Sequence, residues 1–218
     1  MVNPIEISTQ RLFLRQWRST DLEPFAQLNA DPEVMSHFPD TLSRKQSDDL
    51  AQRCQQLIQQ RGWGFWAVEL KSSCAFIGFL GLHIPRADLP FSPCVEIGWR
   101  LAQSHWGNGY ATEGGRAALQ VAFDQLSLEE VVSFTSVENR RSRRVMERLG
   151  MGDSTETFEH PAIPPGIIYD NIVSTAFLKR PGRSLSDRAV PPSGPSRSMT
   201  ASADSRHPPI QRSPPSPC

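Results

Sequence analysis

The sequence has few cysteines and no long apolar run. Its four cysteines, Cys54, Cys74, Cys94 and Cys218, form no Cys-x-x-Cys pair and no tight cluster with histidine, which argues against a structural zinc site and a disulfide framework. No apolar stretch approaches the roughly 18 residues needed to cross a bilayer, and the first ten residues lack the apolar core of a signal peptide. We therefore expect a protein without a metal site, in a reducing cytoplasmic setting.

An excess of charge of one sign is also missing. The 218 residues include 23 basic and 23 acidic side chains, so no strong overall field favours nucleic acid or an anionic membrane surface. We expect neither of them as a partner. The chain is long enough for one globular domain with a proper core.

Large apolar residues almost disappear after Pro181. From there to Cys218 the chain is dominated by Ser, Pro, Arg and Gly. Such a segment cannot bury enough apolar surface to offset the entropy of ordering it. We expect one domain over residues 1–180 and a disordered tail over residues 181–218.

The remaining sequence predicts a mixed α/β domain from its alternating and helical apolar patterns. Expected strands lie near 5–17, 65–70, 76–82, 94–101 and 130–137. Expected helices follow Ser19-Thr20-Asp21, begin briefly at Asp31, run from Ser43 to Gly62, and span about 110–125 and 139–149, the last closed by Gly150.

A strand–turn–helix unit predicts a phosphate site. Gly107 and Gly109 flank Asn108 directly before a helix, and glycines there let several backbone N–H groups point at one place. The helix N-terminus adds free N–H groups and positive dipole charge, which together suit a diphosphate. The turn alone is explained equally well by ordinary helix entry. The missing third glycine and later acid disfavour a dinucleotide fingerprint, and the missing Lys-Ser/Thr pair disfavours a P-loop.

A second segment, Asn139–Met151, follows a strand directly. Asn139 and Ser142 are three residues apart, so they share one side of the expected helix. An ordinary Asn N-cap and a solvated serine would explain them as well. The arginines between 140 and 144 form either a solvated face or contacts to the phosphates of a nucleotide.

These segments together resemble the GNAT superfamily of N-acetyltransferases, in the branch of the ribosomal-protein alanine N-acetyltransferases (the Rim type). The resemblance covers about Pro4 to Gly166 and is carried by Thr9–Arg15, Phe76–Gly81, Glu96–Thr112 and Asn139–Met151. It implies an α/β (α+β) fold: a curved mixed β-sheet with helices on both faces. Two central strands of that fold splay apart and hold acetyl-CoA, the implied cosubstrate.

The resemblance also assigns site residues. The family's pyrophosphate motif falls on residues 106–111, with tryptophan at the position where Gln or Arg is usual. The neighbouring strand would hydrogen-bond the pantetheine through its backbone. The implied cofactor-binding residues are Ile97, Gly98, Trp99, Arg100, Leu101, Trp106, Gly107, Asn108, Gly109, Tyr110, Ala111, Thr112, Asn139 and Ser142.

The implied chemistry is direct attack of a primary amine on the thioester of acetyl-CoA. A backbone N–H near Trp99 would stabilise the oxyanion, and Ser142 would protonate the leaving thiolate. Glu96 is the best candidate for the general base, because burial in an apolar strand would raise its pKa. A carboxylate on the solvent face of the strand is an equally good explanation of Glu96. Weaker candidates for the base are His37, His83 and His105.

The family resemblance stops abruptly after Gly166. His160–Gly166 matches the family's closing segment, but Ile167–Phe177 does not. Reading each codon of Ile167–Phe177 one nucleotide earlier permits the string H-x-L-R-Q-H-x-L-Y-R-L, which is the missing family ending. We therefore expect residues 167–180 and the tail to be out of frame. The alternative is a genuine, lineage-specific end, and the gene sequence decides between them.

The amine acceptor is not readable from the sequence. A protein N-terminus, a polyamine and an amino sugar all remain open, and so does assembly as a homodimer. The loops that would select the acceptor are Asp31–Leu42 and Pro85–Pro93. Two other functions also remain: a non-catalytic or damaged acyl-CoA-binding relic, and a nucleic-acid-binding module that uses Arg140–Arg144.

Overall fold

The computed structural model describes residues 2–158 and 173–179, which belong to one compact unit spanning Met1–Arg180. Three sequence predictions lie outside the described residues: the match at His160–Gly166, the start of the shifted segment and the disordered tail. The domain limits predicted from composition therefore stay a prediction.

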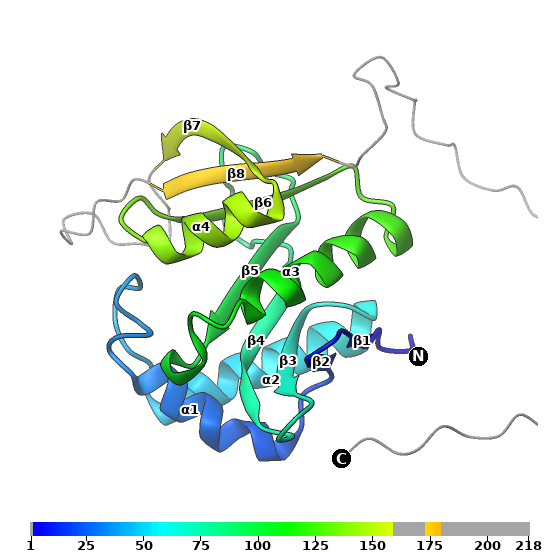
Figure 1. Cartoon of the computed structure of the whole chain (residues 1–218), viewed down its shortest axis with the longest axis vertical. Coiled ribbons are helices and arrows are strands. Elements are labelled where there is room, and N and C mark those ends of the chain that lie inside the picture. Colours follow the sequence, from blue (N-terminus) through cyan, green and yellow to red (C-terminus); the bar gives the residue numbers. More distant parts are fainter. Residues whose placement is uncertain (1, 159–172, 180–218) are drawn as a thin grey trace, which may run out of the picture. The chain divides into compact units, whose positions relative to one another are not determined.

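The core of the unit is one mixed sheet of eight strands in the order β1-β2-β3-β4-β5-β6-β8-β7 (Figure 1). Neighbouring strands are antiparallel except β5 and β6, which are parallel. The strands are β1 (Ile7–Ser8), β2 (Leu12–Arg15), β3 (Phe65–Leu70), β4 (Phe76–His83), β5 (Glu96–Leu101), β6 (Glu130–Ser136), β7 (Gly152–Phe158) and β8 (Val173–Lys179).

Helices cover both faces of this sheet. They are α1 (Leu22–Ala30), α2 (Arg44–Arg61), α3 (Tyr110–Gln120), which continues as a π-helical turn (Val121–Gln125), and α4 (Arg140–Leu149). Consecutive strand residues point to opposite faces. In β4, Phe79 packs against Phe25 of α1 at 5.8 Å, whereas Leu80 lies under Gly114 of α3. The predicted fold, a mixed sheet with helices on both faces, is confirmed.

Local sequence signals set the ends of the long helices. The Ser43 hydroxyl accepts a hydrogen bond from the Gln46 N–H at 3.3 Å, and the Gln46 side chain bonds back to the Ser43 N–H at 2.8 Å. Gly62 ends α2 with φ of 84°, a conformation that glycine adopts without strain. The same capping logic places α4 where the sequence predicts it, between Asn139 and Gly150.

The short helix predicted to begin at Asp31 is wrong. The Asp31 carboxylate does accept from the Glu33 N–H at 2.9 Å, as a helix start requires, but residues 32–40 form successive turns. Pro39 disfavours helical geometry at Phe38, so no helix that starts here could continue beyond residue 37. The connection between α1 and α2 is therefore irregular, and its residues contact Ser136 of β6 and Arg141 of α4.

The strand expected over residues 5–17 is instead two strands joined by a turn. The Thr9 N–H donates to the Leu12 carbonyl at 2.9 Å, and the Lys71 ammonium donates to the Ser8 hydroxyl at 2.7 Å. The polar run from Ser8 to Arg11 is the turn signal within this segment. The turn brings Arg11 beside the start of α3.

Strand β8 lies between β6 and β7. It pairs with β6 over its whole length, from Val173 opposite Ser136 to Lys179 opposite Glu130. The segment follows the point at which the sequence predicts a change of reading frame. That change remains a prediction, because a sheet position is compatible with either reading frame of the gene.

Candidate cofactor and acceptor site

The two central strands of the sheet separate. Glu96 of β5 pairs with Val132 of β6, and the Val132 N–H donates to the Val95 carbonyl at 2.9 Å. No further β5–β6 pair forms within the described part of the chain. Alternate backbone groups of Ile97–Leu101 point away from β4, because an antiparallel ladder uses only every second residue. They therefore face the gap between β5 and β6.

The loop after β5 is turned by two glycines in the left-handed region. Gly107 has φ of 79° and Gly109 has φ of 80°. A Cβ at Gly107 would meet nothing within 4 Å, so this residue borders open space. The loop leads directly into the N-terminus of α3, as the sequence predicts.

Side chains bind the carbonyl groups of this loop. The Trp106 ring N–H donates to the Leu101 carbonyl at 2.8 Å, and the Asn108 amide donates to the His105 and Trp106 carbonyls at 3.2 and 3.1 Å. Arg11 donates to the Asn108 carbonyl at 2.9 Å. The carbonyl dipoles are thus directed away from the loop's open side.

The N–H groups of the same loop remain available. Within the described residues, the backbone N–H groups of residues 107–112 have no hydrogen-bond acceptor, and Glu113 donates the first bond of α3, to Gly109. The Thr112 hydroxyl is buried and also lacks a partner. Free donors at a helix N-terminus form an anion-binding site. A hollow of about 470 Å³ adjoins it, lined by Arg11, Gly109, Thr112, Arg116 and Arg148 among others.

Arg11 is a loop residue that the sequence analysis did not single out. Its guanidinium donates to the Glu113 carboxylate at 2.6 Å and lies 4.6 Å from the centre of the Tyr110 ring. The Thr9 hydroxyl also donates to Glu113, at 2.6 Å. These hydrogen bonds hold the pKa of Glu113 below its usual value, against the effect of its partial burial. Only the β1–β2 turn brings these residues together, so periodicity could not reveal them.

The start of α4 lies beside the glycine loop. Asn139 accepts from the Ser142 N–H at 3.0 Å and donates to the Thr135 hydroxyl at 3.0 Å, so both ends of its amide are bonded within the chain. The Arg141 guanidinium lies 4.4 Å from the centre of the Trp106 ring. The sequence-predicted residues of both segments are therefore brought to one region.

Glu96 lies on the sheet face opposite α3. Its carboxylate approaches Gly98, whose added Cβ would lie 3.4 Å from Glu96 Oε1 and 3.2 Å from the Phe65 ring. His83 of β4 is its register partner across the strands. No ion pair to Glu96 occurs in the described residues, and burial raises the pKa of Glu96 to about 8. A carboxyl with this pKa is mostly protonated at pH 7 and half-ionised near pH 8, and its ionised form can accept a proton.

The Arg100 side chain occupies the same face as Glu96. It donates from Nη1 to the Asn29 amide oxygen at 2.6 Å and lies 4.1 Å from the centre of the Phe38 ring. Its Nε is buried without a hydrogen-bond partner, and burial lowers the pKa of Arg100 to about 10. The family resemblance implied a role for the backbone of Arg100 but none for its side chain.

Both loops expected to select the acceptor reach across to the β6 side of the gap. His37 Nδ1 lies 3.1 Å from the Ser136 hydroxyl, and Glu33 accepts from Arg141 at 3.2 Å. Burial lowers the pKa of His37. In the second loop, the Phe91 ring lies 6.0 Å from that of Phe134. The two loops therefore border the gap, and their role in selecting the acceptor stays a prediction.

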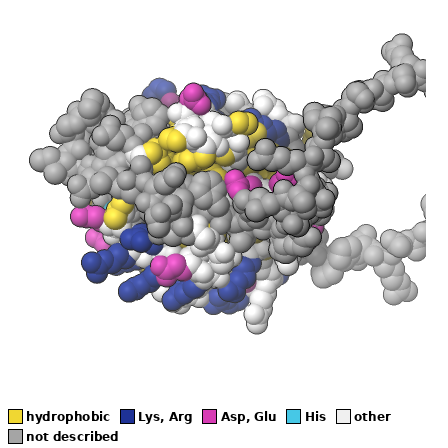
Figure 2. Space-filling model, turned by 90° about the horizontal axis from the view of Figure 1, so that it is seen from above, with side chains coloured by type: hydrophobic (Ala, Val, Ile, Leu, Met, Phe, Trp, Pro, Cys, Tyr) yellow, Lys and Arg dark blue, Asp and Glu magenta, His cyan; other side chains and the backbone are white. Residues whose placement is uncertain are grey.

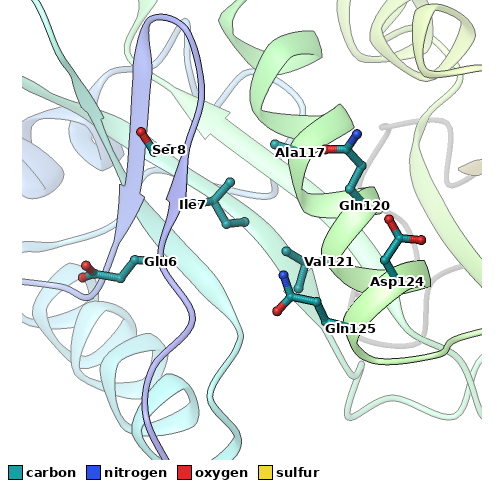
Figure 3. A pocket seen from close by; sticks show the side chains of 8 residues that line it. All are labelled: Glu6, Ile7, Ser8, Ala117, Gln120, Val121, Asp124 and Gln125. Atoms are coloured by element: carbon teal, nitrogen blue, oxygen red, sulfur yellow. The ribbon is translucent and has the colours of Figure 1, made fainter. Parts of the chain in front are cut away.

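Other features of the described residues lie away from this region. A hollow of about 390 Å³ separates β1 from the end of α3, and Ile7 and Val121 extend toward it (Figure 3). It contains none of the predicted site residues. The described residues hold no group of three His, Cys, Asp or Glu side chains suited to a metal, and no helix among them combines the length and apolarity that a membrane span requires.

Basic side chains gather along one side of the end-on view, with acidic side chains among them (Figure 2). Four arginines of α4 are exposed: Arg140, Arg141, Arg144 and Arg148. One of them, Arg141, is already paired with Glu33. This mixture gives no independent support to the nucleic-acid alternative.

Comparisons with known proteins agree with this geometry. Residues 11–152 match the family described as "Acetyltransferase (GNAT) domain". The uncharacterised protein YkkB of Bacillus subtilis is 30% identical over 147 residues, covering 67% of this chain and 84% of YkkB. The FsC-acetyl coenzyme A-N(2)-transacetylase of Aspergillus fumigatus is 32% identical over 152 residues, covering 65% of this chain and 63% of that protein.

Solved structures share the fold. A GNAT-family acetyltransferase from Bacillus anthracis superposes with a TM-score of 0.66 at 22% identity, over 80% of this chain and 98% of that chain. The ribosomal-protein-S5-alanine acetyltransferase of Vibrio fischeri gives a TM-score of 0.62 at 15% identity, over 82% and 98%. At these identities the likeness extends to the fold alone.

Proposed function

The chain belongs to the acetyltransferase (GNAT) family, and from that membership and the site geometry we propose that it transfers an acetyl group from acetyl-CoA to a primary amine. The observation that carries the proposal is the anion cradle of residues 107–112, which opens beside the gap between β5 and β6. A diphosphate at the cradle allows the pantetheine to run along the free edge of β5. The thioester would then reach the region of Glu96.

In the proposed reaction, acetyl-CoA supplies an activated acyl group. Glu96 accepts the proton that the amine loses as it attacks the thioester carbonyl. The backbone N–H near Trp99 stabilises the oxyanion, because β5 pairs there with β4 alone and its β6 side is unpaired. Ser142, whose hydroxyl forms no hydrogen bond among the described residues, returns a proton to the leaving thiolate. Asn139 positions Ser142 by capping α4.

The Rim-type branch is the finer part of the proposal. The shared fold with a ribosomal-protein acetyltransferase supports it only at the level of architecture. A non-catalytic acyl-CoA-binding relic is the competing proposal, and it is favoured by the departure of the sequence from the family pattern after Gly166. Release of CoA in the presence of an amine separates the two, because both would bind the cofactor.

The first test compares two glycines with matched backbone geometry. Gly107 and Gly150 have φ of 79° and 80°, and an added Cβ would meet nothing within 4 Å at either. We expect Gly107→Ala and Gly150→Ala to destabilise the chain similarly, by about 1–2 kcal/mol. Acetyl-CoA at a hundredfold excess over Kd should stabilise the wild type and Gly150→Ala by about 2.7 kcal/mol in thermal melts.

Gly107→Ala should lose most of that stabilisation, because its methyl group enters the space beside the free N–H groups. Equal acetyl-CoA shifts in the two variants would contradict the cradle as the cofactor site. A wild-type chain that melts cooperatively without any shift would contradict the cofactor itself.

A further inference from the structure

Arg100 differs from Arg15, a buried arginine on the same face of the sheet. Arg15 is paired with two carboxylates, Asp21 at 2.8 Å and Glu69 at 2.7 Å. Arg100 has no carboxylate partner among the described residues. Its one hydrogen bond goes to the neutral amide of Asn29, and its Nε is buried and unbonded. Within the described part of the chain, Arg100 is therefore a half-buried cation without a compensating carboxylate.

An unpaired, partly buried guanidinium lowers the stability of the fold unless an anion binds to it. A buried charge without an opposite charge loses its hydration and gains little in return. Aromatic rings at Phe38 and Phe79, 4.1 and 5.4 Å from the guanidinium carbon, recover part of that loss. The guanidinium still has donors suited to a carboxylate, which it binds through two parallel hydrogen bonds.

The position of Arg100 connects it with the acceptor side of the gap. Glu96 and Arg100 are four residues apart on one strand, so they share a face with Cα atoms about 13 Å apart. This face is opposite α3 and its anion cradle. Phe38, which covers Arg100, belongs to a loop that borders the gap, and 37% of its surface is exposed. The Phe65 ring lies over Gly98 between them, so an acceptor whose amine lies at Glu96 has to pass this ring to place its other end at Arg100.

We propose that Arg100 binds a carboxylate of the acceptor, so that the acceptor class is an amino-carboxylate whose two charged groups are separated by several bonds. This proposal rests on the proposed acetyl transfer and narrows its acceptor. The amine end meets the carboxylate of Glu96, and the acid end meets the Arg100 guanidinium, which has no carboxylate partner among the described residues. Arg100 acts as a specificity-determining residue and takes no part in proton transfer.

The test uses a series of ω-amino acids and the matching ω-amino amides, with acetyl-CoA as donor and thiol release as the readout. At the best chain length we expect the carboxylate to exceed its amide in kcat/KM by at least about tenfold, as a charged hydrogen-bonded pair gives. Arg100→Gln should remove this preference by slowing the carboxylates alone, and Arg100→Lys should retain part of it. Arg53→Gln, on the exposed side of α2, is the matched control and should change nothing.

Equal rates for acids and amides at every chain length would overturn the proposal. So would an Arg100→Gln variant that slows both series equally, because that result means the arginine only supports the fold.

A binding measurement separates this proposal from the proposed reaction. The N-acetylated product keeps its carboxylate, so it should raise the melting temperature of the wild type and leave that of Arg100→Gln unchanged. The product amide should stabilise neither chain. This pattern would support the anion site even if no amine releases CoA. Equal stabilisation of both chains by the acid product, or of neither, would overturn it.

Discussion

Glu96→Gln is expected to slow acetyl transfer by about a hundredfold to ten-thousandfold, the usual contribution of a positioned general base. Glutamine has nearly the same shape but cannot accept the amine proton. The loss should appear in kcat, because the attacking amine must lose its proton in the reaction step itself. Steady-state thiol release with a saturating amine measures kcat. A thermal melt with acetyl-CoA shows whether the variant still binds the cofactor.

The same substitution should increase stability at alkaline pH. Burial raises the pKa of Glu96 to about 8 in the folded chain, whereas an unfolded glutamate titrates near 4.3. Between these values the folded state holds more protons than the unfolded state, so the contribution of Glu96 to stability falls as pH rises and levels off above about 8. Each pKa unit corresponds to about 1.4 kcal/mol. Glu96→Gln removes this penalty and should melt higher than the wild type at pH 8.5.

The wild-type rate should rise with pH through about 8 as Glu96 loses its proton, and this step should be missing in Glu96→Gln. Glu147→Gln, on an exposed position of α4, is the matched control and should behave as the wild type. A Glu96→Gln variant with wild-type kcat, or with an unchanged pH profile, would assign the proton to another base. A Glu96→Gln variant that is less stable than the wild type at pH 8.5 would contradict the burial of the Glu96 carboxyl.

Local signals in the sequence were sufficient for most elements of the fold. The Ser43 cap and Gly62 define α2, and the Gly-x-Gly turn before Tyr110 defines both the start of α3 and the anion cradle. Each of these depends on backbone geometry within a few residues, which the sequence encodes directly. The failed helix at Asp31 is instructive, because the Asp31 side chain bonds the Glu33 N–H in a turn in the same way as at a helix start.

The features that could not be predicted depend on contacts between distant segments. Arg11 reaches Glu113 and Asn108 only because a hairpin turn returns the chain to α3. Arg100 reads as an ordinary strand residue until α1 and the following loop cover it with Asn29 and Phe38. Periodicity fixes the face of a strand but not what packs on that face. The cofactor loop could be predicted because its glycines lie within a few residues of each other. The acceptor could not, because the segments that border its site are far apart in the sequence.

Glu69→Gln is expected to cost about 1.5–3 kcal/mol of stability, because it weakens the buried charged hydrogen bond to Arg15 while Asp21 still compensates the arginine. Arg15 bonds Glu69 through Nε and Asp21 through both Nη atoms, and all three side chains are at most 5% exposed. Burial alone would lower the pKa of Arg15, but its hydrogen bonds to the two acids leave it raised. Urea unfolding of the purified chain measures the change.

The control is Asp49→Asn, which removes the partner of Lys45 on the exposed side of α2 and should leave the urea midpoint unchanged. If Glu69→Gln changed the urea midpoint only slightly, water would have to reach the ion pairs of Arg15 in solution. The same urea unfolding experiment also tests Arg100→Gln. If Glu69→Gln destabilises the fold while Arg100→Gln does not, Arg15 contributes to stability and Arg100 does not. Arg15 then stabilises the fold by joining β2, β3 and the start of α1. The Arg100 side chain is then not needed for stability, as expected of a residue that binds a ligand.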